Sequence, residues 1–323
     1  MSKASKIWLI VAAALVLVGI LAFVGVMALR HWNFNALSST KFETTTFEIT
    51  DAFESINIRS DTAAISLEPS TDGACKVVFY VQDDRKTSAA VQSGTLTVEE
   101  TQTGNWYDHI TLFSAETPKI TVYLPQEEYA SLIIDEDTGA VVIPKDFSFD
   151  SIDISADTGA VECLASAAER LQIETDTGNI HVENISAGEL WLSVSTGLVE
   201  ARAIDCAGRV DVTVSTGRAR LTDVRCQSLS SKGSTGALIM ENVIAEEGIT
   251  VKRSTGDVTL ERCDAGELNI QTATGAVTGT LLTEKIFFAE SDTGHVEVPK
   301  TTSGGTCTIT TDTGDIRIEI APH

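Results

Sequence analysis

Proline is scarce in this chain of 323 residues, and none occurs from residue 145 to residue 298. Proline has no backbone N–H donor, so it is excluded from strands that are paired on both sides. So long a stretch without proline indicates continuous β-structure in which the backbone donors pair with neighbouring strands.

Motifs that would carry catalysis are also lacking. The sequence has no serine elbow, no phosphate-binding loop and no close cysteine pair of metal-ligand spacing. Asp-Thr-Gly, the active-site triplet of aspartic proteases, occurs five times, but those enzymes need two such loops that face each other. Equivalent corners stacked along one edge cannot make one facing pair. We therefore predict no catalytic residue, no cofactor and no enzymatic activity.

Basic residues are few as well, with 23 Lys and Arg against 46 Asp and Glu. Three of the basic residues and none of the acidic ones precede residue 31, so the remainder carries a formal charge of −26. The resulting negative field repels nucleic acid, for which the sequence offers no basic stripe, and it attracts cations and cationic peptides. The alternative is that the acidity only keeps an extended β-protein soluble.

What the sequence does contain is a corner of three residues, Asp, Ser or Ala followed by Thr and Gly. It recurs ten times at intervals of 19 or 20 residues. Glycine permits the backbone angles of a sharp bend, and the central threonines would stack about 4.8 Å apart as a hydroxyl ladder. So constant a period is typical of a stacked-repeat protein. The corner glycines are Gly139, Gly159, Gly178, Gly197, Gly217, Gly236, Gly256, Gly275, Gly294 and Gly314.

Each repeat shows the period-2 alternation of a half-buried strand. Apolar residues lie two and four places after the corner glycine, as at Ile180 and Val182, and seven places after it, as at Ile185. A second alternating set, such as Leu190 and Leu192, precedes the next corner. One repeat therefore supplies one turn of a parallel β-helix. We predict an all-β fold, a single-stranded β-solenoid of about ten regular coils over residues 131–320.

Residues 7–29 form a run without any charge, long enough to cross a hydrocarbon core of about 30 Å as a helix. Met27-Ala28-Leu29-Arg30 is a poor cleavage site, which favours a retained transmembrane anchor over a signal peptide. Lys3 and Lys6 precede the run, so residues 1–6 are predicted to be a cytosolic tail and the rest to be extracytoplasmic. We expect a single-pass protein of the cell membrane.

Residues 30–46 are predicted to be a polar stalk. Residues 47–130 are rich in strands, but their period is degraded, and we expect elaborated coils that cap the solenoid; a separate small β-sandwich is the alternative. Asp61-Thr62-Ala63 resembles a worn corner, 76 residues or four periods of 19 before Gly139.

At the other end of the chain, Arg317 and Glu319 place charges on the last predicted strand. Charged residues on a terminal strand discourage edge-to-edge pairing with another sheet. We therefore expect this strand to close the solenoid.

Asp137, Asp157 and Asp176 would lie on consecutive coils, where like charges repel each other unless a cation intervenes. Calcium takes 6–8 oxygen ligands at about 2.3–2.6 Å, so this row is a candidate calcium site. Solvated turn aspartates with a structural role alone are the alternative.

The chain has six cysteines. Cys163, Cys263 and Cys307 fall on inward positions, where a thiol packs as a small hydrophobic group. Cys206 and Cys226 share one register on adjacent coils, which leaves open a disulfide or two idle thiols.

The pattern from Ile120 to Pro125, then Leu132-Ile-Ile and Asp137-Thr-Gly-Ala-Val, followed by reiterated Ser-Thr-Gly, resembles a known family. These are the bacterial putative-adhesin, β-strand-repeat proteins, also called toast-rack domains, most of which have no known function. The resemblance covers roughly residues 47–320. It implies a β-solenoid outside a bacterial membrane, and some relatives are linked to envelope stress or adhesion.

The leading hypothesis is a membrane-anchored, non-enzymatic β-solenoid that binds a cell-envelope protein, a cationic peptide or a surface polymer, in adhesion or envelope-stress sensing. One alternative is a structural spacer, since ten coils reach roughly 45–50 Å. Another is a polysaccharide-active β-helix enzyme. Against that enzyme, Trp191 is the only Trp in the regular repeats.

Overall fold

The computed structural model describes residues 3–29, 41–102 and 117–322. Helix α1 (Lys3–Leu29) contains one segment, Trp8–Leu29, that is long and apolar enough to cross a membrane, with a mean hydropathy of 3.0. A signal sequence would have the same properties. Residues 30–40, which include Arg30 and make up most of the predicted stalk, lie outside the described residues.

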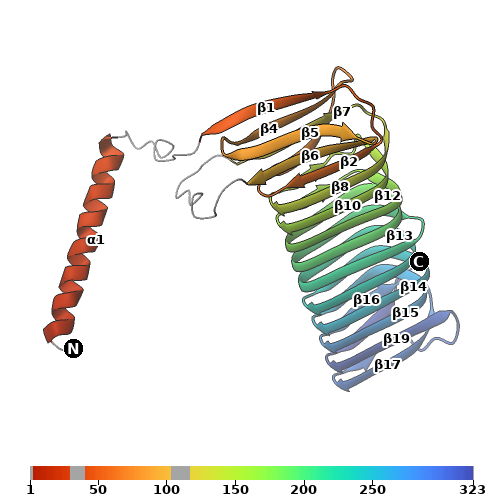
Figure 1. Cartoon of the computed structure of the whole chain (residues 1–323). Helices are drawn as coiled ribbons and strands as arrows, with labels where there is room; N and C mark the ends of the chain where they lie inside the picture. The colour runs from red at the N-terminus through yellow and green to blue at the C-terminus, as the bar shows by residue number, and fades with distance from the viewer. Residues whose placement is uncertain (1–2, 30–40, 103–116, 323) are drawn as a thin grey trace.

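The rest of the described chain is β-structure, and its strands belong to one continuous hydrogen-bonded stack (Figure 1). The N-terminal strands are β1 (Phe42–Ile49), β2 (Ser55–Ser60), β3 (Ala64–Pro69), β4 (Cys75–Gln82), β5 (Arg85–Gln92), β6 (Thr95–Gln102) and β7 (Lys119–Leu124). The regular coils hold β8 (Glu128–Thr138), β9 (Val141–Ile143), β10 (Ser148–Thr158), β11 (Val161–Cys163), β12 (Ser166–Cys206), β13 (Arg209–Thr235), β14 (Leu238–Thr255) and β15 (Val258–Thr274). The last coils hold β16 (Val277–Leu281), β17 (Lys285–Thr293), β18 (Val296–Glu297), β19 (Gly305–Thr313) and β20 (Ile316–Ile320).

Successive coils pair in parallel with equivalent residues side by side. Thr196 lies beside Thr216, and Thr255 lies beside Thr274, so the corner threonines form one exposed column. The inward residues of the coils form one continuous core, in which Ile180 is fully buried. The predicted β-solenoid of about ten coils is confirmed.

The corner glycines are required because the coils approach each other closely there. Gly236 has a φ of 131°, and a Cβ on this residue would lie 1.5 Å from the carbonyl oxygen of Gly217. No other residue type fits between two backbones at that separation. Glycine is therefore required at the corner for two reasons, the turn geometry that we predicted and the contact between adjacent coils.

Each of five consecutive coils also has a second corner that the sequence analysis missed. It lies six residues after the corner glycine, in the left-handed region, for example at Asn184 (φ 55°), Asp223 (φ 55°) and Asn242 (φ 53°). Asn and Asp tolerate this conformation better than most residues, which is the signal that could have revealed it. The bend turns the following apolar residue, such as Ile185, into the core.

The N-terminal region adds strands at the first end of the stack. Strands β2 and β3 pair in parallel with β8 and β9, and β6 and β7 pair in parallel with β2 and β3. Strand β4 pairs antiparallel with β7, and β1 pairs antiparallel with β4. Strand β5 pairs antiparallel with β6. The worn corner is adjacent to the first regular one, because a Cβ on Gly139 would lie 3.1 Å from the Ala63 carbonyl oxygen. A separation of four periods would place three further coils between the two corners. The intervening chain instead forms the outer strands.

The last two coils are stacked out of sequence order. Strand β19 pairs with both β15 and β17, and β20 pairs with both β16 and β18. The final coil of the chain is thus inserted between its two predecessors, and β17 lies at the end of the stack (Figure 1). The prediction that Arg317 and Glu319 occupy the edge strand is wrong, since both lie on β20. Phe288 of the actual edge strand is 58% exposed.

Candidate functional site

The corner aspartates Asp137, Asp157 and Asp176 lie on three consecutive coils, since the adjacent Thr158 pairs with both Thr138 and Thr177. Burial, together with the neighbouring charges of Asp61 and Asp157, raises the pKa of the Asp137 carboxyl. Asp176 accepts a hydrogen bond of 3.2 Å from the hydroxyl of Ser195 on the next coil. Within the described ranges, no group of three His, Cys, Asp or Glu side chains converges as a metal site. Calcium binding by this row stays a prediction.

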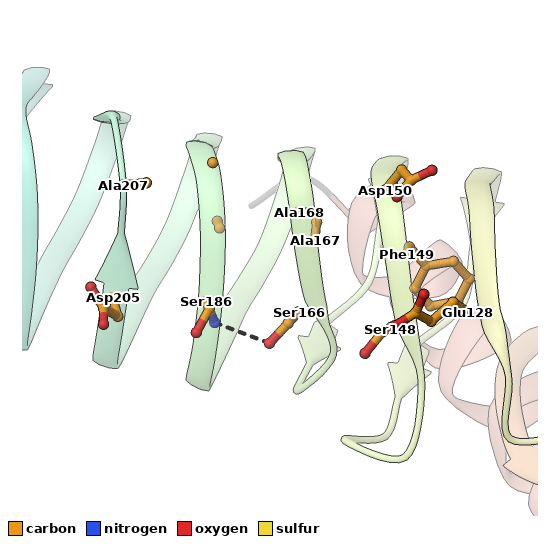
Figure 2. Close-up of a pocket in the computed structure, with 12 residues that line it drawn as sticks. Glu128, Ser148, Phe149, Asp150, Ser166, Ala167, Ala168, Ser186, Asp205 and Ala207 are labelled. Carbon is orange, nitrogen blue, oxygen red and sulfur yellow. Dashed lines mark hydrogen bonds between the residues drawn. The ribbon is translucent and has the colours of Figure 1, made fainter.

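A groove of about 510 Å³ crosses the first regular coils (Figure 2). Equivalent positions of successive coils line it, so that Ser148, Ser166 and Ser186 follow one another. The Ser186 N–H donates a hydrogen bond of 3.0 Å to the Ser166 hydroxyl oxygen, which fixes one coil against the next. The groove is therefore built by the repeat itself.

Small side chains form the floor of this groove and carboxylates stand around it. Ala167 and Ala187 are buried, and Glu128, Asp150 and Asp205 contribute the acidic groups. Among the described residues, no hydrogen bond joins a serine hydroxyl of the groove to one of its carboxylates.

Buried charges gather where the N-terminal strands meet the solenoid. The Glu100 carboxylate accepts hydrogen bonds from the Ser60 hydroxyl (3.1 Å) and from the backbone N–H of Asp61 (3.1 Å), and it lies 3.3 Å from an Arg85 nitrogen. Burial, with the adjacent Glu100 charge, raises the pKa of Glu136 to about 8. This shift favours the protonated form of the Glu136 carboxyl at neutral pH. The enclosure of this cluster points to a structural role.

All six cysteines are buried and free. The disulfide alternative for Cys206 and Cys226 is therefore not realised. Burial raises the pKa of the Cys163 thiol to about 12 and that of Cys263 to about 11. Thiols of this kind stay protonated and are poor nucleophiles.

Taken together, these residues define a β-solenoid repeat protein whose ionisable groups are spread over grooves and columns. The chain belongs to the Toastrack DUF4097 family, which matches residues 53–319. The family resemblance of the sequence is thereby confirmed. No curated protein matches the chain.

Several solved bacterial structures are similar over most of the chain. One is a "putative lipid binding protein" from Parabacteroides distasonis ATCC 8503, with 15% identity, a TM-score of 0.46 and coverage of 75% of this chain and 95% of that one. A "putative adhesin" from the same organism has 11% identity, a TM-score of 0.45 and coverage of 85% and 98%. A "putative adhesin" from Bacteroides fragilis NCTC 9343 has 17% identity, a TM-score of 0.34 and coverage of 87% and 99%.

Proposed function

We propose that the protein is a membrane-anchored, extracytoplasmic binding protein without enzymatic activity, acting in surface attachment or in the sensing of envelope conditions. Helix α1 would be the anchor, and the solenoid would stand outside the membrane. The observation that carries the proposal is the regular stack itself, which presents grooves and charged columns on its outer surface. Membership of the Toastrack family supports it.

The spread of ionisable groups also supports binding rather than catalysis. Catalytic acids and bases work within hydrogen-bond reach of one reacting centre. In the solenoid, equivalent side chains repeat once per coil, which suits a long partner with a repeating structure. The partner would be a cell-envelope protein, a cationic peptide or a surface polymer.

A sedimentation experiment tests this function. The full-length chain in detergent micelles is incubated with purified cell-wall polymer, and the pellet is assayed for protein while the supernatant is assayed for newly released reducing ends. We expect co-sedimentation without release of reducing ends. Release would indicate a polysaccharide-active enzyme, and failure to co-sediment with any envelope fraction would favour a spacer.

Topology is tested separately. Protease added to intact protoplasts should digest the solenoid and leave α1 protected. Survival of the full-length chain until the cells are lysed would place the solenoid on the cytosolic side and contradict the proposal.

A further inference from the structure

One surface in the middle of the solenoid differs in charge from the rest. It consists of the outward positions two, four and six residues before five successive corner glycines, from Gly197 to Gly275, and we call it the central face. Asp211 is the only acidic residue at these positions. By contrast, six of the nine corresponding positions before Gly139, Gly159 and Gly178 are acidic. The negative field of the solenoid is therefore interrupted here.

Two lysines occupy the centre of the central face. Lys232 and Lys252 are exposed and lie side by side on adjacent coils. Like charges paired in this way destabilise a sheet unless a counter-charge is present. The one carboxylate of the face does not supply it, because Asp211 is paired with Arg209, whose Nη2 donates a hydrogen bond of 2.9 Å to Oδ1.

A third positive charge lies directly behind the lysines. Arg253 follows Lys252, is 4% exposed and points inward, where its Nη2 donates a hydrogen bond of 2.9 Å to the neutral Ser231 hydroxyl. Its Nε and Nη1 have no hydrogen-bond partner among the described residues. Burial lowers the pKa of Arg253 to about 10, so the guanidinium is still charged at neutral pH. A buried charge is screened little by salt, and it raises the potential at the surface above it.

The surface is hollowed at the same place. A hollow of about 390 Å³ is lined by Lys232, Lys252 and several hydroxyl side chains, with one carboxylate, Asp312, also in its lining. A second hollow of about 400 Å³ is lined by Trp191, Arg209 and Lys232, together with the carboxylates of Glu174 and Asp211. Because Lys232 lines both, the two hollows adjoin and can hold one ligand.

Trp191 gives the second hollow an aromatic wall. Trp191 is 39% exposed, its Nε1 donates a hydrogen bond of 3.3 Å to Glu189, and the Arg209 guanidinium carbon lies 5.7 Å from the ring centroid. Glu189 holds the ring nitrogen and the Arg209 guanidinium lies over the ring. The part of the indole that stays exposed offers apolar surface to the C–H groups of a sugar ring. Trp191 and Lys232 are two coils and two strand positions apart, roughly 12 Å.

We infer that the central face binds a phosphate-bearing glycan, with a phosphate between Lys232 and Lys252 and a sugar ring against Trp191. This inference rests on the proposed surface-binding function and names the class of polymer that is bound. The serine and threonine hydroxyls between these groups donate hydrogen bonds to phosphate and sugar oxygens. The repulsion between the stacked lysines is relieved when the anion binds.

Binding of three probes to the full-length chain in detergent micelles tests the inference: phosphorylated dextran, neutral dextran and inorganic polyphosphate. We expect phosphorylated dextran to bind at least about tenfold more tightly than either of the others, since only it engages both the lysines and Trp191. The double variant Lys232→Gln/Lys252→Gln should lose about tenfold in affinity for it, and Trp191→Ala a comparable factor. Lys119→Gln/Lys145→Gln, which removes the same charge from exposed sites elsewhere, should bind as the wild type does.

Equal losses in the two double variants would show that only net charge matters and would overturn the site. Polyphosphate binding as tight as that of phosphorylated dextran would overturn the glycan assignment. If no dextran derivative binds while the chain still co-sediments with envelope polymer, the assignment of the central face as a glycan site is wrong and the surface-binding function stands. Unchanged thermal unfolding of each variant establishes that the fold is intact.

Discussion

The guanidinium of Arg253 occupies the space that Gly233 leaves empty on the neighbouring coil. The two residues are paired in register, and a Cβ on Gly233 would lie 1.8 Å from Nη1 of Arg253. In the coils before them the same inward position holds Val194 and Val214, both fully buried. The large polar side chain of Arg253 thus enters the apolar column beside a residue that has no side chain.

This complementarity makes Gly233 intolerant of a side chain. Gly233→Ala should lower the free energy of unfolding by about 1–3 kcal/mol, because the methyl group and the guanidinium cannot share the space and the buried charge must move. Urea unfolding of the full-length chain measures the change. Gly248→Ala is the matched control, since a Cβ there meets no atom closer than 3.3 Å. Equal stabilities of the two variants would contradict the packing described.

The order of the last coils can be tested with engineered disulfides. Thr308 lies beside Asn269 on one side and beside Phe288 on the other. Adjacent parallel strands place such Cα atoms about 4.8 Å apart, within reach of a disulfide, whereas Asn269 and Phe288 are separated by two strand spacings. Oxidation should therefore cross-link Asn269→Cys/Thr308→Cys but not Asn269→Cys/Phe288→Cys. Mass spectrometry of peptides detects the bond, and the reverse result would restore the stacking in sequence order.

The sequence was sufficient for the repeat and insufficient for the order of the coils. The position of Gly236, the threonine column and the burial of Ile180 follow from relations within one period, which a single chain displays. The corners at Gly275, Gly294 and Gly314 are equivalent in sequence, so nothing local distinguishes their order in the stack.

A signal for the reversed order lies at the start of β19. A Cβ on Gly304 would lie 1.8 Å from the Glu284 carbonyl oxygen, and one on Gly305 would lie 1.8 Å from that of Gly266. The glycine pair thus fits between two backbones where the final coil enters the stack. The sites were less predictable still, because the central face joins residues of different types from several coils, and only register brings Trp191, Lys232 and Lys252 together.

Glu136 should make the stability of the first end depend on pH. Burial raises its pKa from an ordinary 4.5 to about 8, and the neighbouring charges of Glu100 and Asp137 act in the same direction. The ion pair between Glu100 and Arg85 lies nearby. A group whose pKa is raised by folding stabilises the fold fully below its unfolded pKa. That stabilisation is lost as the pH rises through the folded value. The wild type should therefore weaken between about pH 4.5 and 8.

The variant Glu136→Gln tests this. It should match the wild type near pH 4 and exceed it in thermal stability near pH 9, because its side chain is neutral throughout. Exposed Glu128→Gln is the control and should follow the wild type at both values. Hydrogen exchange would locate the effect in β2 and β8, and a wild-type pH profile in Glu136→Gln would exclude this carboxyl as the cause.

The acidic corners are expected to recruit cations on the coils that precede the central face. Asp137, Asp157 and Asp176 should together bind a polycationic peptide, and binding should weaken steeply from low to physiological salt because exposed charges are screened over about 8–10 Å. Replacing the three by Asn retains turn-forming side chains and should reduce the affinity about tenfold. Calorimetry with the peptide and, in a separate arm, with calcium measures both ligands.

The control of equal charge replaces three exposed glutamates by Gln: Glu169, Glu246 and Glu261. If this control and the corner variant lose the same affinity, the corners serve only the fold; a calcium signal lost in the corner variant alone would assign the ion to this row.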